Sequence, residues 1–365
     1  MAEYDLAIIG AGIAGASLAA EIAPYARVLL LEGEDAPGYH TTGRSAAFWE
    51  ECYGGPELVP LSRASEAFLR EGGFLSPRGA LYIGRAEDAG KLDAFAARFA
   101  DSGARFDRLA TGAARDYVAS LLPQWCEAIW QPHCADIDVA GLHQHYLKTA
   151  KHGGARLEVR ALVQSLDRQS EGWTIRCADG REWRAAAIAN AAGAWADKLA
   201  GMAGARPLGI QPLQRTMLQL SVDPPLPRDG PLTLDISGRF YFKPEGGGSL
   251  WLSPHDETPV PPVDAAPEEL AVAQAIDRFG GVVDAEIRKI ERTWAGLRSF
   301  APDRKPVYGW DPRLPGFFWF AGQGGFGIQT APAAARLASQ LFLGRPRDAM
   351  TQALDEQSFS PARFV

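Results

Sequence analysis

Gly10, Gly12 and Gly15 stand between two apolar runs, and their spacing is typical of a turn that receives a pyrophosphate. Gly10 allows a tight turn, Gly12 lets the backbone approach the phosphates, and Gly15 lets the following helix pack against the first strand. Glu32 closes the second apolar run, near the spacing of roughly 20 residues at which an acid accepts a hydrogen bond from a ribose hydroxyl. The segment therefore predicts a strand, a glycine turn, a helix and a second strand that together bind a dinucleotide.

Composition limits the class of protein. The 365 residues are 47% hydrophobic and 22% charged, as in globular proteins, and the net charge of −7 disfavours a nucleic-acid-binding surface. Four cysteines without Cys-x-x-Cys spacing are too few for a disulfide framework, so we expect reduced thiols and a cytoplasmic protein. The first apolar run lacks the preceding basic segment that is typical of a secretory signal. No apolar run reaches about 18 residues, so we expect no transmembrane span. Peripheral association with a membrane stays open.

Apolar β-rich runs alternate with alanine-rich stretches, which indicates one α/β chain rather than two independent modules. Asp179–Gly180 is a hairpin turn signal. A glycine-rich loop is expected at 323–330 and a helix at 333–341, an arrangement that suits an anionic group. The strands expected around these features lie at 155–160, 172–177, 182–184, 186–195 and 316–322.

Two intervening stretches, 46–140 and 206–295, are richer in aromatic residues and proline, and we expect them to form one β-rich substrate-binding cap. The nucleotide domain is then discontinuous. It comprises 1–45, 141–205 and 296–365. A nicotinamide dehydrogenase usually has one contiguous nucleotide domain, whereas a tightly held FAD is gripped by segments far apart in sequence, so this pattern favours FAD. The elements expected in the cap are strands at 217–222, 240–243 and 250–253 and a helix at 268–279.

Five further motifs carry a resemblance to a known family: Gly38–Ala47, Ala135–Asp138, Asn190–Trp195, Thr293–Phe300 and Gln323–Thr330. With the opening glycine motif, they make the chain similar to the D-amino acid oxidase superfamily of FAD-dependent amine oxidoreductases, and within it to the bacterial D-arginine dehydrogenases. The resemblance implies an α/β (α+β) fold with a Rossmann-like FAD-binding domain of the glutathione-reductase type and a β-rich cap. It also implies a non-covalently bound FAD that contacts Gly10, Gly12, Ile13, Gly15, Glu32, Thr42, Arg44, Ser45, Ala46, Ala47, Val163, Gly193, Trp195, Gly324, Gly325, Phe326, Gly327, Ile328, Gln329 and Thr330.

The same resemblance implies substrate-binding residues. Arg215 and Arg298 align with arginines that bind the substrate carboxylate, for which a guanidinium offers bidentate geometry. Tyr53 and Tyr241 align with tyrosines that hydrogen-bond the substrate. From the residues alone, a structural ion pair for Arg298 and ordinary core packing for the tyrosines stay open.

Departures from the family bear on the substrate side chain. The resemblance places Phe48, Trp49, Ala80 and Gly325 in the substrate pocket, where Ala80 replaces the glutamate that pairs with a guanidinium and Phe48 replaces a histidine. A guanidinium buried without an acidic partner would be strongly disfavoured. We therefore predict neutral, apolar or aromatic D-amino acids as substrates in preference to D-Arg.

The expected reaction is hydride transfer from the substrate Cα to flavin N5, followed by hydrolysis of the imine to a 2-oxo acid and ammonia. No strong side-chain base is needed once the ammonium group has lost its proton, so catalysis is mainly positioning and electrostatics. Secondary amines such as N-alkyl glycines, or 2-hydroxy acids, are alternative substrates, and a non-catalytic flavoprotein is a third possibility. The electron acceptor, a quinone or O2, stays open. No metal is expected, because the histidines lack the further ligands of a metal site.

Overall fold

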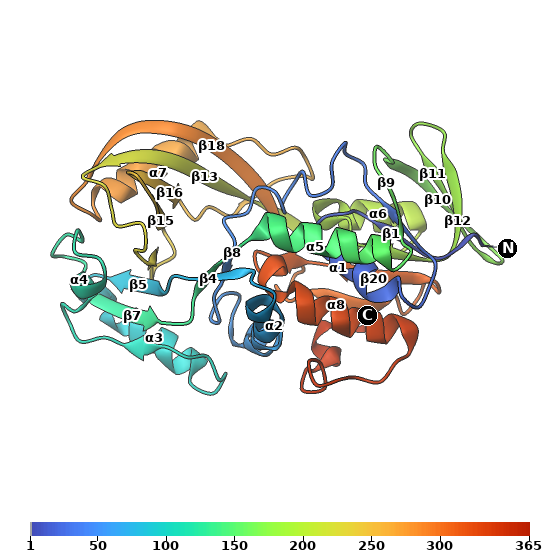
Figure 1. Ribbon diagram of the computed structural model, residues 1–365, viewed down its shortest axis with the longest axis horizontal. Helices are drawn as coiled ribbons and strands as arrows, with labels where there is room; N and C mark the ends of the chain where they lie inside the picture. Colours follow the sequence, from blue (N-terminus) through green and yellow to red (C-terminus); the bar gives the residue numbers. More distant parts are fainter. Residues whose placement is uncertain (1) are drawn as a thin grey trace.

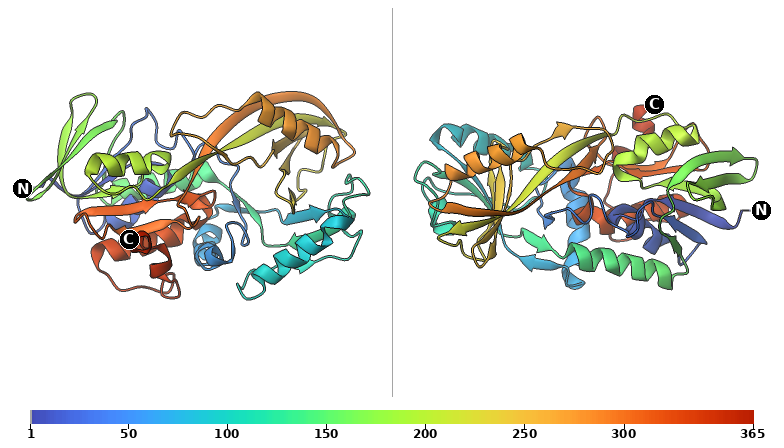
Figure 2. Two further views of the ribbon diagram at one scale, coloured as in Figure 1. Left: turned by 180° about the vertical axis from the view of Figure 1, so that it is seen from behind. Right: turned by 90° about the horizontal axis from the view of Figure 1, so that it is seen from above.

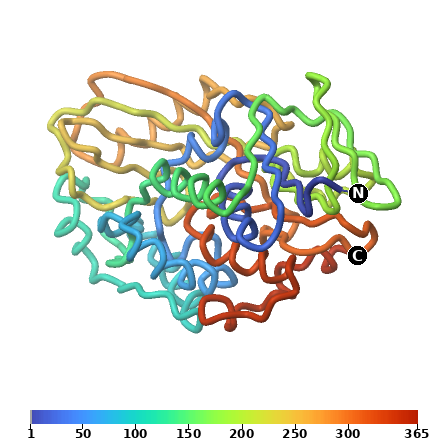
Figure 3. The backbone as a smooth tube through the Cα atoms, turned by 45° about the vertical axis from the view of Figure 1, so that its right-hand side comes forward, coloured from blue at the N-terminus to red at the C-terminus, as the bar shows by residue number. Residues whose placement is uncertain are grey.

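Two β-sheets divide the chain between them. The computed structural model describes residues 2–365, in which one lobe is built on a mainly parallel sheet and the other on a mainly antiparallel sheet (Figure 1). Both chain termini lie in the first lobe. The views from behind and from above show the same division (Figure 2), and the backbone crosses between the lobes several times (Figure 3). The expected α/β fold class is confirmed.

The first sheet is organised around β1 (Tyr4–Ile9), which is parallel to β2 (Val28–Leu31) on one side and to β12 (Glu182–Asn190) on the other. Leu6 of β1 lies opposite Val28 and Ala187. Continuous apolar runs are typical of such strands because both faces of the sheet are covered. The other strands of this sheet are β9 (Arg156–Glu158), β10 (Val163–Gln169), β11 (Gly172–Cys177), β19 (Val307–Trp310) and β20 (Phe317–Ala321).

Helices cover one face of this sheet, and a helix and a hairpin cover the other. Leu6 and Phe318 share the first core with α1 (Ile13–Ile22), α5 (Val139–His152) and α8 (Gly327–Leu343). Ala7 and Trp173 lie in the second core, which includes α6 (Ala196–Ala203) and the β10–β11 hairpin. Neighbouring residues of one strand enter different cores because side chains alternate between the two faces of a sheet.

The second sheet is dominated by β13 (Gln211–Asp223) and β18 (Glu286–Phe300), which pair antiparallel over their whole length. Phe279 of α7 (Glu269–Gly280) packs with Leu218 and Phe242 on one face. Helices α3 (Ala89–Phe99) and α4 (Ala114–Tyr117) lie beside its strands. The remaining strands are β5 (Ala80–Gly84), β6 (Asp107–Arg108), β7 (Glu127–Gln131), β14 (Leu232–Asp235), β15 (Tyr241–Gly246), β16 (Ser249–Ser253), β17 (Thr258–Pro259) and β21 (Gln323–Gly324).

A small sheet of β3 (Phe48–Trp49), β8 (Ala135–Ile137) and β4 (Leu75–Pro77) lies between the lobes. Helix α2 (Val59–Glu71) follows β3 and packs against α8, where the Ser65 hydroxyl accepts a hydrogen bond from the Ala333 N–H at 3.1 Å. Part of the stretch expected in the cap thus lies against a helix of the first lobe. The domain boundaries stay a prediction.

Two expected element boundaries are wrong. Helix α8 begins at Gly327 rather than at 333, so residues 327–330 form its first turn instead of a loop. Pro332 lies inside this helix, although proline is more typical of a helix start. The two strands expected at 182–184 and 186–195 are one strand, because Ala185 continues the pairing with Tyr4 of β1.

None of the helices described, of which α8 is the longest with 17 residues, is long and apolar enough to cross a membrane.

The close contact of Gly15 with the glycine turn gives a first prediction. A Cβ atom at Gly15 would lie 1.8 Å from the Gly10 carbonyl oxygen, so Gly15→Ala must displace the turn or the helix. We expect a loss of roughly 1–3 kcal/mol in the free energy of unfolding, the usual cost of overpacking. Denaturant unfolding measures this loss. Gly90→Ala is the matched control, because a Cβ there meets nothing within 4 Å and alanine favours the α3 helix. Equal stability of Gly15→Ala and the wild type would contradict the contact.

Candidate active site

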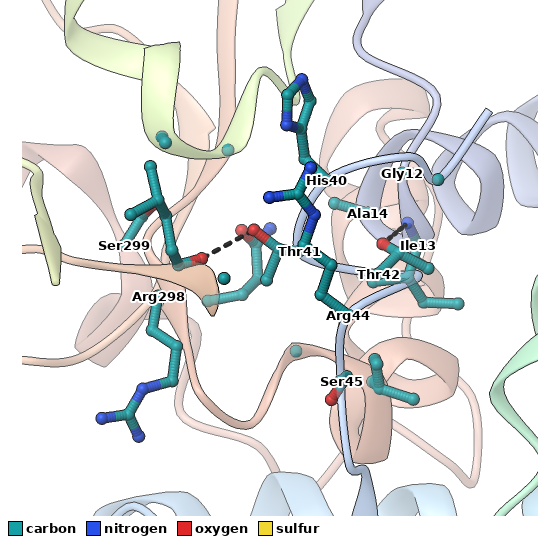
Figure 4. A pocket seen from close by; sticks show the side chains of 18 of the residues that line it. Gly12, Ile13, Ala14, His40, Thr41, Thr42, Arg44, Ser45, Arg298 and Ser299 are labelled. Carbon is teal, nitrogen blue, oxygen red and sulfur yellow. Dashed lines mark hydrogen bonds between the residues drawn. The ribbon is translucent and has the colours of Figure 1, made fainter. Parts of the chain in front are cut away.

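A continuous cavity runs from the carboxyl ends of the parallel strands into the space between the lobes. This edge of an open α/β sheet is where ligands bind. Gly12 and Ile13 lie on one side of the view in Figure 4, and Arg298 and Ser299 on the other, with residues 40–45 between them. The wall combines segments that are far apart in the sequence, among them 9–14, 31–34, 38–48, 161–163, 191–195, 296–299 and 323–325.

The glycine turn is shaped for close approach by a phosphate. Gly10 has a φ of +101°, which strongly favours glycine, and Gly12 lines the cavity with no side chain. The Thr42 hydroxyl accepts a hydrogen bond from the Ile13 N–H at 2.9 Å, as Figure 4 shows, and so ties the next segment to the first turn of α1. The positive end of the α1 dipole therefore opens on the cavity.

Glu32 is held at the end of β2 by the glycine turn itself. Its Oε2 accepts a hydrogen bond from the Ala11 N–H at 2.9 Å, and its Oε1 accepts one from the Glu34 N–H at 3.0 Å. A carboxylate has about four acceptor positions, so two are left for ribose hydroxyls. Buried His143 supports the same turn, since its Nε2 lies 2.9 Å from the Ala11 carbonyl oxygen.

The stretch 38–45 is anchored to the second lobe by its side chains. The Thr41 hydroxyl donates to the Leu297 carbonyl oxygen at 2.6 Å (Figure 4). Arg44 Nη1 donates to the carbonyl oxygens of Ala265 and Ala295 at 2.9 and 3.1 Å. These contacts fix the backbone of the stretch along the cavity, where it can follow an extended ligand.

The residues present fit an FAD. The first turns of both α1 and α8 line the cavity, so two helix N-termini supply backbone N–H groups, one suited to a pyrophosphate and the other to the flavin ring. Most residues expected at the cofactor line this cavity: Gly10, Gly12, Ile13, Glu32, Thr42, Arg44, Ser45, Ala46, Ala47, Val163, Gly193, Trp195, Gly324, Gly325, Gly327, Ile328 and Gln329.

Gly15, Phe326 and Thr330, also expected at the cofactor, do not line the cavity. Gly15 faces Gly10, as its predicted packing role requires. The Phe326 ring packs edge-on against Tyr53, at a centroid distance of 6.3 Å, and the Thr330 hydroxyl donates to the Phe326 carbonyl oxygen at 2.9 Å inside α8. All three residues support the wall from behind.

Trp49 and Ala80, expected in the substrate pocket, are fully buried behind its wall, whereas Phe48 and Gly325 line it. Side chains alternate along β3, so Phe48 and Trp49 point to opposite sides, and Trp49 Nε1 donates to the Ser62 carbonyl oxygen at 3.0 Å. Ala80 lies inside the second sheet beside Leu232, and it is Leu232 that reaches the cavity.

The pairing of β13 with β18 brings Arg215 and Arg298 together. Arg215 lies opposite Gly296, and Leu213 lies opposite Arg298, so the two arginines are diagonal neighbours on one face of the sheet. Both side chains line the cavity, and the residues are only 7% and 8% exposed. Two buried guanidinium groups side by side form a site for an anion.

Protein partners leave part of this arginine pair unsatisfied. Arg215 Nε donates to the Asp256 carbonyl oxygen at 2.9 Å, and Arg298 Nη2 donates to the Glu257 carboxylate at 2.7 Å. Glu257 is shared with Arg304, at 3.0 Å. Within residues 2–365, buried Arg215 Nη2 and Arg298 Nε have no hydrogen-bond partner. Donors left in this state fit a carboxylate brought by a ligand.

Electrostatics keep this end of the cavity positive. Burial and the neighbouring Arg298 lower the pKa of Arg215. Burial also acts to lower the pKa of Arg298, but Tyr53 and Glu257 outweigh it, and the net shift is upward. Burial, together with both arginines, lowers the pKa of His255 to about 2, so this imidazole stays neutral beside them. His255 therefore adds no charge to the site.

The two predicted tyrosines line the cavity beside the arginines. The Tyr53 hydroxyl accepts a hydrogen bond from Arg298 Nη1 at 2.7 Å, and a Cβ atom at Gly325 would lie 2.0 Å from that hydroxyl. Tyr241 contacts the Sδ atom of Met217 through its hydroxyl at 3.0 Å, and the Arg215 guanidinium lies 5.8 Å from its ring centroid. Position 325 must therefore be glycine for Tyr53 to keep its place.

Glu50 is a cavity residue that sequence analysis missed. It lines the wall between Phe48 and Tyr53 and is only 2% exposed. Burial raises the pKa of its carboxyl to about 7, although hydrogen bonds from the Tyr82 hydroxyl and the Cys52 N–H oppose the rise. No pattern distinguishes Glu50 from Glu51 in the sequence, because only the phase of the chain around β3 decides which of them reaches the cavity.

Other wall residues were also missed or misplaced. His255, considered only as an incomplete metal ligand, lines the cavity, and its Nδ1 is buried without a partner. Met217 and Leu234 complete the apolar part of the wall. The sequence offered no way to find them, since they come from different strands of the cap. No group of three or more His, Cys, Asp or Glu residues within 2–365 is arranged to hold a metal ion.

Comparison with known proteins agrees with this geometry. Two curated relatives are subunit HcnC of the Pseudomonas aeruginosa hydrogen cyanide synthase, 27% identical over 220 residues, and the L-2-hydroxyglutarate dehydrogenase of Escherichia coli K12, 26% identical over 232 residues. The matches cover 60% and 56% of this chain and 50% and 51% of the relatives, so the chain matches about half the length of each.

Solved structures show the same fold. Glycine oxidase from Geobacillus kaustophilus superimposes with a TM-score of 0.83 at 24% identity over 98% of both chains. L-Proline dehydrogenase from P. horikoshii superimposes with a TM-score of 0.84 at 21% identity, over 100% of this chain and 98% of the other. The two-lobed architecture is therefore shared with these two enzymes.

A family model settles the relationship and the cofactor. The model described as FAD dependent oxidoreductase (DAO) matches residues 5–341, which include both lobes and every segment of the cavity wall. This match, the glycine turn with Glu32, and the two helix N-termini at one cavity agree with one another. The chain belongs to the DAO family of FAD-dependent oxidoreductases, and its cofactor is FAD.

Proposed function

We propose that this protein oxidises a small carboxylated amine, with D-amino acids as the first substrate class. The observation that carries the proposal is the buried pair Arg215 and Arg298, which keeps N–H groups without a protein partner and lines the cavity that also holds the FAD-binding elements. A carboxylate bound there would fix one end of the substrate. The FAD, when bound, supplies the acceptor for the hydride that leaves the substrate Cα.

The protein's own contribution is to bind, orient and exclude water. Arg215 and Arg298 bind the carboxylate, and the Tyr53 hydroxyl holds Arg298 in place at 2.7 Å. The α8 N-terminus presents backbone N–H groups to the electron-rich flavin ring. His255, the histidine beside the arginines, is not a strong base, since its pKa is lowered to about 2 by burial and the arginines. Positioning then carries most of the rate enhancement.

The side-chain preference rests on fewer residues than the sequence indicated. The similarity to D-arginine dehydrogenases came from the shared motifs, whereas the preference for neutral or aromatic D-amino acids over D-Arg came from Phe48, Trp49 and Ala80. Of these three, only Phe48 lines the cavity. Phe48, Leu232 and Leu234 support an apolar stem on the substrate. We therefore propose an apolar contact for the part of the substrate side chain near Cα. The far end of that side chain would be recognised by another residue.

Two other substrate classes use the same carboxylate site. A similar fold is found in an L-proline dehydrogenase, whose named substrate is a secondary amine, and a curated relative is an L-2-hydroxyglutarate dehydrogenase. Both substrates carry a carboxylate next to the oxidised carbon. The electron acceptor, O2 or a quinone, and a cytoplasmic location with reduced cysteines complete the proposal.

Anaerobic reduction of the bound FAD tests the reaction class. We expect apolar D-amino acids to bleach the flavin absorbance of the purified holoenzyme and to release ammonia, because the arginine pair holds the carboxylate while the Cα hydrogen faces the flavin. The panel includes L-amino acids, N-methyl glycine and 2-hydroxy acids. Release of an alkylamine, or bleaching by 2-hydroxy acids alone, would move the function to one of the two other classes. A flavin that no member of the panel bleaches would contradict all three.

Replacement of Arg298 tests the carboxylate site. We expect Arg298→Met to raise KM by about 100-fold with a smaller change in kcat, because the arginine binds the carboxylate in ground state and transition state alike. Steady-state kinetics on the best substrate of the panel measures both constants. Arg304→Met is the matched control, since Arg304 also pairs with Glu257 but does not line the cavity. Equal KM values in the two variants would contradict the role of Arg298. Flavin content checks that each variant is folded.

A further inference from the structure

Glu50 presents a carboxyl group that the proposed reaction does not use. Its backbone is fixed to the first turn of α8: the Glu50 N–H donates to Gln329 Oε1, and Gln329 Nε2 donates to the Glu50 carbonyl oxygen, both at 3.1 Å. Its carboxylate accepts hydrogen bonds from the Cys52 N–H at 2.9 Å and from the Tyr82 hydroxyl at 3.0 Å. The side chain is thus held firmly in the cavity wall.

No cation neutralises this carboxyl. None of the ion pairs formed within residues 2–365 involves Glu50, and its hydrogen-bond donors are all uncharged. Buried carboxylates are normally paired, because an isolated ionised group loses its hydration. A donor brought by a ligand would therefore meet a buried carboxyl group that no protein cation neutralises.

The next residue shows the ordinary arrangement. Glu51 is also 2% exposed, but its carboxylate pairs with Arg105 at 2.8 Å and lies 3.7 Å from Arg63. Glu51 does not line the cavity. Two buried glutamates are therefore adjacent in the sequence. Glu51 forms an ion pair with an arginine, whereas Glu50, at the cavity, has no cationic partner.

Apolar and aromatic side chains accompany Glu50 in the cavity wall. Tyr82, whose hydroxyl donates to its carboxylate, belongs to a cluster with Phe48, Leu234 and Tyr241, all three of which line the cavity. The cavity wall thus combines the two arginines, an apolar section and an acidic group. A ligand that matches it has a carboxylate, an apolar stem and a hydrogen-bond donor.

We propose that Glu50 selects the substrate by accepting a hydrogen bond from an N–H or O–H group at the end remote from the substrate carboxylate. The inference rests on the proposed function, because it takes the arginine pair as the carboxylate anchor. It changes the expected side chain from a purely apolar one to an apolar stem with a polar end. An ammonium, amide or hydroxyl group has the required chemistry.

Among the titratable groups around Glu50, the Glu50 carboxyl is the one whose charge changes near neutral pH. Burial raises the pKa of Cys52, Cys134 and Tyr82, so these groups stay uncharged at neutral pH. Burial raises the pKa of the Glu50 carboxyl to about 7, so at pH 8 most of it is ionised and can accept from a cation or from a neutral donor. Glu51 keeps its pairing with Arg105.

Binding of non-oxidisable ligands tests the proposal without turnover. The holoenzyme is titrated at pH 8 with ω-amino and ω-hydroxy carboxylates of four to seven carbons and with alkanoates of the same number of non-hydrogen atoms. These ligands lack an amine or hydroxyl group beside the carboxylate and carry the donor at the far end. Dissociation constants come from the change in flavin absorbance or from calorimetry, for the wild type, Glu50→Leu, Glu50→Gln and the control Glu51→Gln.

For each chain length, the measured quantity is the ratio of the affinity for the donor-ended ligand to the affinity for its methyl-ended match. We expect one chain length at which this ratio is at least about tenfold higher in the wild type than in Glu50→Leu. Glu51→Gln should keep the wild-type ratio. A loss of the ω-amino preference in Glu50→Gln would identify a cationic substrate end, and retention of the ω-hydroxy preference there would identify a neutral one. If Glu50→Leu does not fold with its flavin, the proposal is tested by Glu50→Gln alone, through the change in its ω-amino preference relative to the wild type.

Two results would overturn the proposal, and they differ in what else they contradict. An unchanged donor-to-methyl ratio in the Glu50 variants at every chain length, with carboxylates still bound, would reject the role of Glu50 and leave the proposed function intact. Failure of every carboxylate to bind the wild type would reject the carboxylate anchor and, with it, the inference that rests on it.

Discussion

The register between β13 and β18 is the constraint on which the active site depends. It places Leu213 opposite Arg298 and Arg215 opposite Gly296, so both arginines project from one face of the sheet. A slip of one residue would turn one of them to the other face, because side chains alternate along a strand. The same strand continues into pairing with β21, where Ser299 lies opposite Gly324. The backbone hydrogen bonds of β18 thus connect the arginine pair to Gly324 in the cavity wall.

This register places two like charges close together in a buried site, which is unfavourable unless other groups compensate. Glu257 compensates in part, since it binds Arg298 at 2.7 Å and lies 3.7 Å from Arg215, but it is shared with Arg304. The uncompensated remainder is a positive potential in a place where water is scarce and electrostatic interactions are strong. Complementarity to a carboxylate follows from this incomplete pairing, and a fully paired cluster would have much less affinity for an anion.

The turn from Glu50 to Tyr53 couples the two lobes at the reacting end of the cavity. Glu50 is bound through its backbone to Gln329 of α8, and Tyr53 is bound through its hydroxyl to Arg298 of β18. Gly325 must lack a side chain for Tyr53 to fit. The turn therefore adjoins α8, the arginine pair and the apolar wall at once, and under the proposed function changes in it would alter both substrate position and substrate choice.

Local patterns in the sequence were enough to predict the cofactor and the class of fold. The glycine spacing, Glu32 and the apolar runs follow local rules of turn geometry and strand burial, and Gly10, Gly12 and Glu32 line the cavity. The resemblance to a family added the two arginines, the two tyrosines and most of the cavity wall. The start of α8 was misplaced because Pro332 lies within the helix rather than at its start.

Which of two neighbouring residues faces the cavity depends on strand pairing in the folded chain. Phe48 reaches it and Trp49 does not, Glu50 reaches it and Glu51 does not, and Leu232 stands where Ala80 was expected. The pairing of β3 with β8, and of β5 with β14, sets these outcomes, since a shift of one residue exchanges inward and outward side chains. That pairing joins residues far apart in the chain, and the order of the residues alone does not contain its phase.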